Sequence, residues 1–62
     1  MTGKELRRLR KRLGMIQAEL AQAIGMQNNS VARMERGERP IMKTTEMAVR
    51  YLLVMKSKKG GK

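Results

Sequence analysis

Side chains that commonly carry out catalytic or metal chemistry are scarce in this chain of 62 residues. It contains no Cys and no His, and its acidic residues are Glu5, Glu19, Glu35, Glu38 and Glu46. Without His, both the usual general base and the commonest metal ligand are missing, and no two of the carboxylates are placed for acid–base work. The sequence therefore predicts a protein that is not an enzyme and that uses neither a metal nor another cofactor.

Basic side chains are what the chain has in excess. Fifteen Lys and Arg against five Glu give a formal charge of +10 at pH 7. A chain this basic is expected to bind phosphate groups, in nucleic acid or on an anionic membrane surface. The charge therefore narrows the partners before any motif is considered.

One short segment combines amide and guanidinium side chains that can recognise the edges of bases. Asn or Gln can bind adenine through two hydrogen bonds, Arg can bind guanine O6 and N7, and Ala can contact the thymine methyl group. Each good pair discriminates against the wrong base by about 1–3 kcal/mol. In the alternative interpretation, Gln27 or Asn28 only caps a helix and Arg33 is a solvated charge. The candidate base contacts are Gln27, Asn28, Asn29, Ala32 and Arg33.

These side chains can act together only if a helix presents them, and the sequence predicts four helices. Thr2 and Glu5 have the spacing of a capping box, so the first helix is expected to begin at Gly3 and to end at Gly14. Leucines recur inside it at helical spacing, which places its apolar face toward a core.

The remaining helices are predicted at 17–24, at 28–36, and from a cap at Thr44 or Thr45 to Met55. A glycine follows each of the two short helices and stops it. No alternation of period two indicates a strand, so the fold class is all-α. The inward face of the fourth helix is assigned to Met47, Ala48, Tyr51, Leu52 and Met55.

The chain is divided into a compact four-helix domain, or at most a five-helix one, over 1–56 and a disordered basic tail over 57–62. The two short helices have the pattern of a helix-turn-helix motif. Ala21 provides the small residue where the helices cross, and Gly25 accepts the positive φ of the turn. Apolar residues bracket the turn and continue along the inner face of the next helix, namely Leu20, Ile24, Met26, Val31 and Met34.

Two runs, LGMIQAELA at 13–21 and MERGERP at 34–40, resemble the lambdoid phage repressor and Cro group, usually called the XRE family in bacterial regulators. The strong resemblance covers 6–41, and a looser one extends to about residue 53. It implies a lambda-repressor-like helical domain whose third helix enters the major groove of DNA. The chain departs from the pattern at Ile16, which cannot cap a helix, and at Gln27, where Ser or Thr is more usual. We also expect the chain to end too soon for the larger partner domain that many members of the family carry.

Four further residues are candidate contacts to DNA phosphates. Gln17 resembles the phosphate contact of the family, aided by the positive end of its helix. Three basic residues lie at or just beyond the end of the third predicted helix, where a contact to the DNA backbone is expected. Each of them can equally be a solvated surface charge. The phosphate candidates are Gln17, Arg36, Arg39 and Lys43.

Arg10 and Glu35 are predicted to form a structural ion pair. Arg10 lies on the inward stripe of the first helix with Leu6 and Leu13, and Glu35 lies on the inward edge of the third. Two charges that point toward a core are tolerated only when they pair. The family resemblance implies the same pair.

The function expected from these patterns is sequence-specific binding of double-stranded DNA by a cytoplasmic transcriptional regulator, a repressor, from a bacterium or phage. One helix-turn-helix covers few base pairs, so a homodimer on two half-sites about 10 base pairs apart is expected, with the fourth helix as candidate interface. Residues 4–12 are mostly charged, so no secretory signal is predicted.

Two alternatives from other classes remain open. The same domain can serve an antitoxin-like or accessory protein that mainly holds a protein partner of unknown identity. A basic amphipathic peptide on a membrane surface would explain the charge, but not the residues of the turn. We expect such a peptide to have little structure without lipid.

Overall fold

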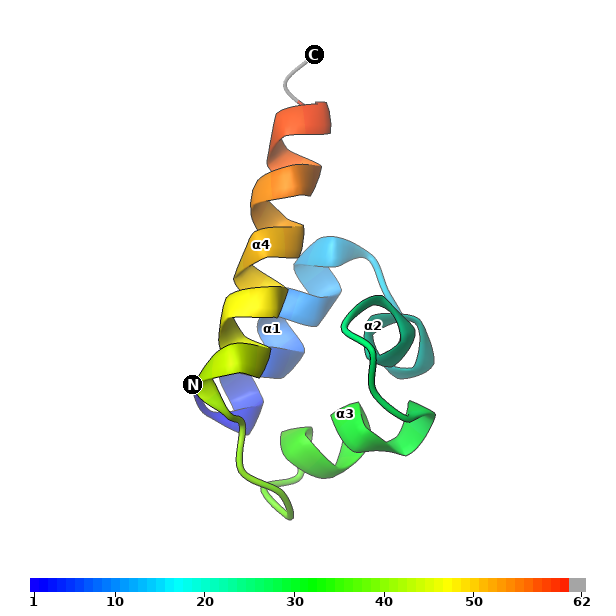
Figure 1. Ribbon diagram of the computed structural model, residues 1–62, viewed down its shortest axis with the longest axis vertical. Helices are drawn as coiled ribbons and strands as arrows, with labels where there is room; N and C mark the ends of the chain where they lie inside the picture. Colours follow the sequence, from blue (N-terminus) through cyan, green and yellow to red (C-terminus); the bar gives the residue numbers. More distant parts are fainter. Residues whose placement is uncertain (61–62) are drawn as a thin grey trace.

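The computed structural model describes residues 1–60, and four α-helices make up most of this part of the chain (Figure 1). They are α1 (Gly3–Leu13), α2 (Gln17–Ala23), α3 (Asn28–Glu35) and α4 (Lys43–Gly60). Residues 1–60 contain no strand, which confirms the predicted all-α class. None of these helices has the combined length and apolar character needed to cross a membrane.

α1 packs against α4 and α3, and α2 packs mainly against α3. Figure 1 shows α4 beside α1, and α2 and α3 joined by a tight turn on the other side. The C-terminal turns of α4 extend beyond the other three helices. This arrangement leaves α3 packed against α2 and α1 on its inner side, while its outer side faces solvent.

The start of α1 has the capping box that the sequence predicts. The backbone N–H of Glu5 donates to Thr2 Oγ1 at 3.1 Å, and the N–H of Thr2 donates to Glu5 Oε1 at 2.8 Å. The helix ends at Gly14, whose φ of 72° is the left-handed conformation that glycine adopts without strain. Both ends of α1 are therefore set by local sequence.

At Gly3, α1 comes so close to the end of α3 that no side chain fits. A Cβ atom there would lie 2.5 Å from the carbonyl oxygen of Glu35 and 2.7 Å from that of Met34. Both oxygens belong to the backbone, so they cannot move aside as the tip of a flexible side chain can. The first turn of α1 is therefore fitted directly onto the last turn of α3.

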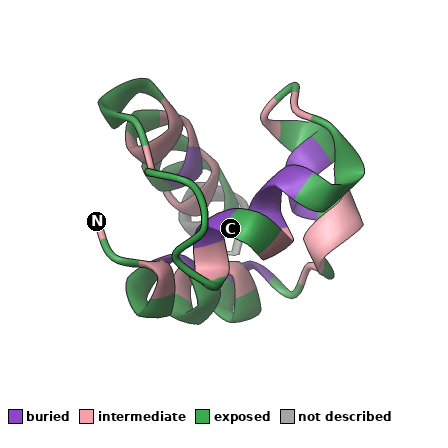
Figure 2. Cartoon of the chain, turned by 90° about the horizontal axis from the view of Figure 1, so that it is seen from below, coloured by how far each residue is buried: buried purple, intermediate pink, exposed green. Residues whose placement is uncertain are grey.

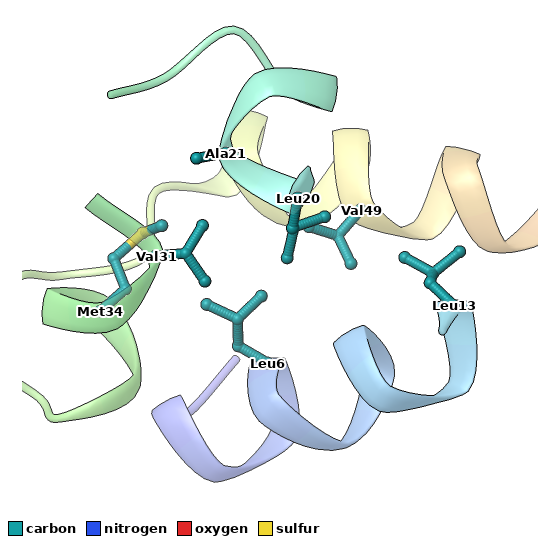
Figure 3. Packing of buried hydrophobic residues seen from close by; sticks show 7 residues of the cluster. All are labelled: Leu6, Leu13, Leu20, Ala21, Val31, Met34 and Val49. Carbon is teal, nitrogen blue, oxygen red and sulfur yellow. The ribbon is translucent and has the colours of Figure 1, made fainter. Parts of the chain in front are cut away.

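A small aliphatic core joins all four helices. Figure 3 shows Leu6, Leu20 and Val31 pointing toward one another from three different helices, with Val49 of α4 beside Leu20. Buried residues lie on the inward sides of the helices and exposed residues cover the outside (Figure 2). The buried apolar residues are Leu6, Leu13, Leu20, Ala21, Val31, Met34 and Val49.

The inward face of α4 differs from the predicted one. Val49 is fully buried and Leu52 is half-buried, whereas Met47 and Tyr51 are 61% and 62% exposed. Met55 is exposed as well, so the prediction was wrong for these three residues and right for Ala48 and Leu52, which are half-buried. The helix has apolar residues on two sides, and helical spacing alone cannot tell which side meets the core.

Both ends of α4 also differ from the sequence prediction. The helix begins at Lys43, where the N–H of Glu46 already donates to the carbonyl of Met42 at 3.0 Å, so a cap at Thr44 or Thr45 was wrong. It continues to Gly60, so 57–60, predicted as disordered, are helical. Lys is a good helix former, and no helix-breaking residue comes before the glycine. Residues 61–62 of the predicted tail lie outside the described part, and the division at 56 stays a prediction.

Candidate nucleic-acid interface

The turn between α2 and α3 holds the two helices at a fixed angle. Gly25 has a φ of 74°, and the N–H of Met26 donates to the carbonyl of Ala21 at 2.8 Å. Ala21 and Val31 are fully buried where the helices meet. The small side chain lets α3 approach closely, as expected from the sequence, so the outer face of α3 has a defined orientation.

The candidate base-contact residues lie along α3 and at its beginning. Gln27, Asn28, Asn29 and Arg33 are exposed, and Ala32 is half-buried. Gln27 occupies the N-cap position but makes no side-chain cap hydrogen bond. The side chain of Gln27 therefore does not cap α3, and the contacts of these residues to bases stay predictions.

The predicted ion pair is present. Arg10 Nε donates to Glu35 Oε2 at 2.6 Å and Arg10 Nη2 donates to Glu35 Oε1 at 3.3 Å. The side chains are only 12% and 7% exposed, so both charges are largely withdrawn from water. Arg10 Nη1 also donates to the carbonyl of Met15 at 3.0 Å. One guanidinium therefore links α1, the connection to α2, and the end of α3.

Gln17 belongs to the same network. Its Nε2 donates to Glu35 Oε1 at 3.1 Å, and the residue is half-buried at the first position of α2. The carboxylate of Glu35 thus accepts from two helices at once. The proposed phosphate contact of Gln17 stays a prediction, because in this arrangement its amide is directed at Glu35.

The beginning of α2 has only half of a capping box. Ile16 has no side-chain acceptor and makes no cap hydrogen bond, as the sequence implied. Its backbone N–H donates to Glu19 Oε1 at 3.0 Å. One otherwise free backbone donor is thereby satisfied.

Arg39 spans from the loop after α3 back to the first turn of that helix. Its Nη1 donates to Ser30 Oγ at 3.1 Å, and Ser30 is buried. Together with the turn residues, these two side chains line a shallow hollow beside Gln27. Lys43 is exposed at the start of α4. The four phosphate candidates are therefore distributed over three elements, and Gln17, Arg36 and Arg39 already have protein partners.

Arg36 and Arg33 share one carboxylate at the end of α3. Arg36 Nε donates to Glu38 Oε2 at 2.9 Å, and Nη2 donates to Oε1 at 3.2 Å. Arg33 Nε lies 3.9 Å from Glu38 Oε1. The hydrogen bonds from Arg36, and then its charge, hold the pKa of Glu38 below the usual 4.5, and Glu38 raises the pKa of Arg36 in turn. All three side chains are about half exposed.

Comparison with known proteins now decides the family. A family profile described as a helix-turn-helix domain matches residues 3–55, which is most of the chain. The chain belongs to the helix-turn-helix domain family. Searches of curated proteins and of solved structures gave no match. Membership of this family indicates DNA binding and gives no positive evidence of catalysis.

Two residues of this helix-turn-helix domain were not among the sequence candidates. Ser30 was overlooked because a polar residue in the first turn of a helix is usually exposed, and the sequence gives no sign that this one is buried. Glu38 was overlooked because it follows the helix. A signal for it exists, since glycine after a helix commonly folds the next residue back over the last turn. Gly37 does so here, with a φ of 81°.

Proposed function

We propose that this helix-turn-helix domain binds a specific sequence of double-stranded DNA and regulates transcription as a repressor that occupies an operator. The observation that carries the proposal is the exposed outer face of α3, where the amides of Gln27, Asn28 and Asn29 have no partner among residues 1–56. In helix-turn-helix proteins the beginning of the second helix of the motif meets the base edges. A row of free amides there is suited to adenine.

The remaining contacts follow from the same docking. Arg33 is proposed to bind guanine, and Ala32 to contact a thymine methyl group. Arg36 and Arg39 follow the last turn of α3 and Lys43 is the first residue of α4, and all three are proposed as phosphate contacts. Each phosphate that they neutralise should steepen the dependence of log Kd on log salt by about 0.9.

A second copy of the chain is the proposed partner on DNA. The exposed side of α4 carries Met47, Tyr51, Val54 and Met55 at helical spacing, an apolar stripe unlike the rest of this charged surface. One helix-turn-helix contacts too few base pairs for tight binding, so we propose that two copies meet along this stripe and bind two half-sites. The area of one such helix face is small for a stable dimer, which favours assembly on the operator.

The same apolar stripe supports a second candidate function, in which the domain mainly holds a protein partner. An apolar helix face also suits a protein partner, as in an antitoxin-like protein that holds a second chain. The membrane-surface alternative loses its basis, because it requires a chain without a fold of its own, whereas α1 to α4 share one buried core. A partner that co-purifies with the expressed protein would favour the accessory role.

Selection from a pool of randomised duplexes at about 0.15 M salt tests the proposed function. A two-fold symmetric enriched motif is the expected result, and absence of any enriched sequence would refute the proposal. On the enriched duplex, Asn29→Ala should weaken binding about tenfold, because one adenine contact is lost. The matched control is Gln22→Ala, which removes an exposed amide from the last turn of α2 and should leave Kd unchanged.

A further inference from the structure

The end of α3 is built so that the residue after it returns to the helix. The N–H of Gly37 donates to the carbonyl of Met34 at 3.2 Å, and the N–H of Glu38 donates to the carbonyl of Arg33 at 2.9 Å. This pair of bonds is the Schellman arrangement, in which a left-handed glycine reverses the chain. The backbone of Glu38 is thereby fixed over the last turn of α3, next to the two arginines of that turn.

The carboxylate of Glu38 is the counterion of both arginines. It accepts two hydrogen bonds from Arg36, at 2.9 and 3.2 Å, and lies 3.9 Å from Arg33 Nε. Two positive charges and one negative charge leave this cluster with a net charge of +1. In the free protein, the charges of Arg33 and Arg36 are therefore already partly neutralised by a residue of the same chain.

DNA has to compete with Glu38 for these side chains. A phosphate that takes Arg36 replaces one anion by another and brings its own charge close to the displaced carboxylate. Such an exchange gains little, since exposed ion pairs are weak and like charges repel. A guanine that takes Arg33 gains two directed hydrogen bonds in addition, and these are available only where the base is correct.

We propose that Glu38 is an internal counterion that limits the affinity of the domain for DNA, because Arg33 and Arg36 must leave this carboxylate before they can bind a phosphate or a base. The inference rests on the proposed function and deepens it. The ion pairs must be broken on any duplex that engages these arginines, so their cost lowers the affinity for cognate and unrelated DNA alike. The half-exposed side chains can exchange partners without unfolding any part of the domain.

Glu38→Gln tests the proposal, because glutamine keeps an oxygen that can accept from Arg36 and removes only the charge. The matched control is Glu46→Gln. Glu46 likewise accepts from an arginine Nε at 3.0 Å, from Arg50 of α4, and it lies outside the helix-turn-helix. Both variants raise the net charge by one. Thermal unfolding followed by circular dichroism establishes that both remain folded.

Binding is measured to a mixed-sequence duplex of about 20 base pairs and to the duplex enriched by selection, between about 50 and 200 mM salt. Glu38→Gln should bind the mixed-sequence duplex about fivefold more tightly at low salt, with a log–log salt slope steeper by about 0.9 for each arginine released. Its affinity for the enriched duplex should rise by at least as much, because the same ion pairs no longer have to be broken there. Glu46→Gln should change either affinity by less than about twofold.

Equal effects of the two variants on the mixed-sequence duplex would overturn the inference, because net charge alone would then explain the result. So would an unchanged affinity of Glu38→Gln for the enriched duplex. Failure of the proposed function is a different result, namely that no duplex is enriched at all. In that case a larger gain for Glu38→Gln than for Glu46→Gln on the mixed-sequence duplex would still show that Glu38 restrains the two arginines.

Discussion

Replacement of Gly3 by alanine should destabilise the domain, although intrinsic helix propensity predicts the opposite. Alanine inside a helix is favoured over glycine by roughly 0.5–1 kcal/mol, because glycine loses more backbone entropy on folding. The added Cβ, however, would meet the carbonyl oxygens of Glu35 and Met34 at 2.5 and 2.7 Å. Relief of this overlap requires that the first turn of α1 moves away from the last turn of α3.

The size of the effect follows from these two opposing terms. A methyl group forced into a packed contact costs about 1–3 kcal/mol, and here the neighbours are backbone atoms that cannot rotate away. Set against the propensity gain, Gly3→Ala should lower the free energy of unfolding by about 1–2 kcal/mol. In a domain of this size that corresponds to a fall in Tm of about 10 °C.

Urea and thermal unfolding, followed by far-UV circular dichroism, measure this loss directly. Lys4→Ala is the appropriate control, since it places alanine at the next, exposed position of the same turn. It should change the free energy of unfolding by less than about 0.5 kcal/mol. A Tm for Gly3→Ala equal to or above that of the unchanged chain would refute the reasoning, because the two helices would then not be in backbone contact.

Glu35→Gln should lower the free energy of unfolding by about 2–3 kcal/mol in urea titrations, because Arg10 would stay largely buried without its counterion; an unchanged midpoint would exclude a structural role. Arginine partners lower the pKa values of Glu38 and Glu46. The stability that these two ion pairs add to the fold is therefore complete above about pH 4.5, and it is lost as the pH falls through the lowered pKa values. Tm should decline in this pH range, and it should decline less when Glu38→Gln and Glu46→Gln are combined. An identical decline in the two proteins would show that these ion pairs are not its cause. Gly37→Ala should cost about 1 kcal/mol at φ 81°, whereas D-alanine at that position should cost none in thermal unfolding.

The sequence was sufficient for features that depend on neighbouring residues. The capping box of Thr2 and Glu5 sets the start of α1, and the glycines with positive φ set the ends of the first three helices, both through local backbone chemistry. The pair of Arg10 and Glu35 was also predictable, because both charges lie on inward stripes and burial leaves an unpaired charge no stable alternative.

Features that depend on how α4 lies against the other helices could not be predicted from spacing. Val49 and Tyr51 are both apolar positions of one helix, and only the packing against α1 selects the first for the core. The partners of Gln17 and Arg39 were hidden for a related reason. Each side chain reaches a residue of another turn or helix, Glu35 and Ser30, whose position depends on the assembled fold.

The exposure of Tyr51 gives the protein an optical label of its own. It is the single aromatic residue of the chain, which has no Trp and no Phe, so near-ultraviolet absorption and emission arise from one phenol. That ring is 62% exposed in the middle of the apolar stripe of α4. A partner that covers the stripe must take the ring out of water. Iodide quenching of tyrosine emission would then count covered and uncovered chains directly, without a dye and without altering the recognition helix.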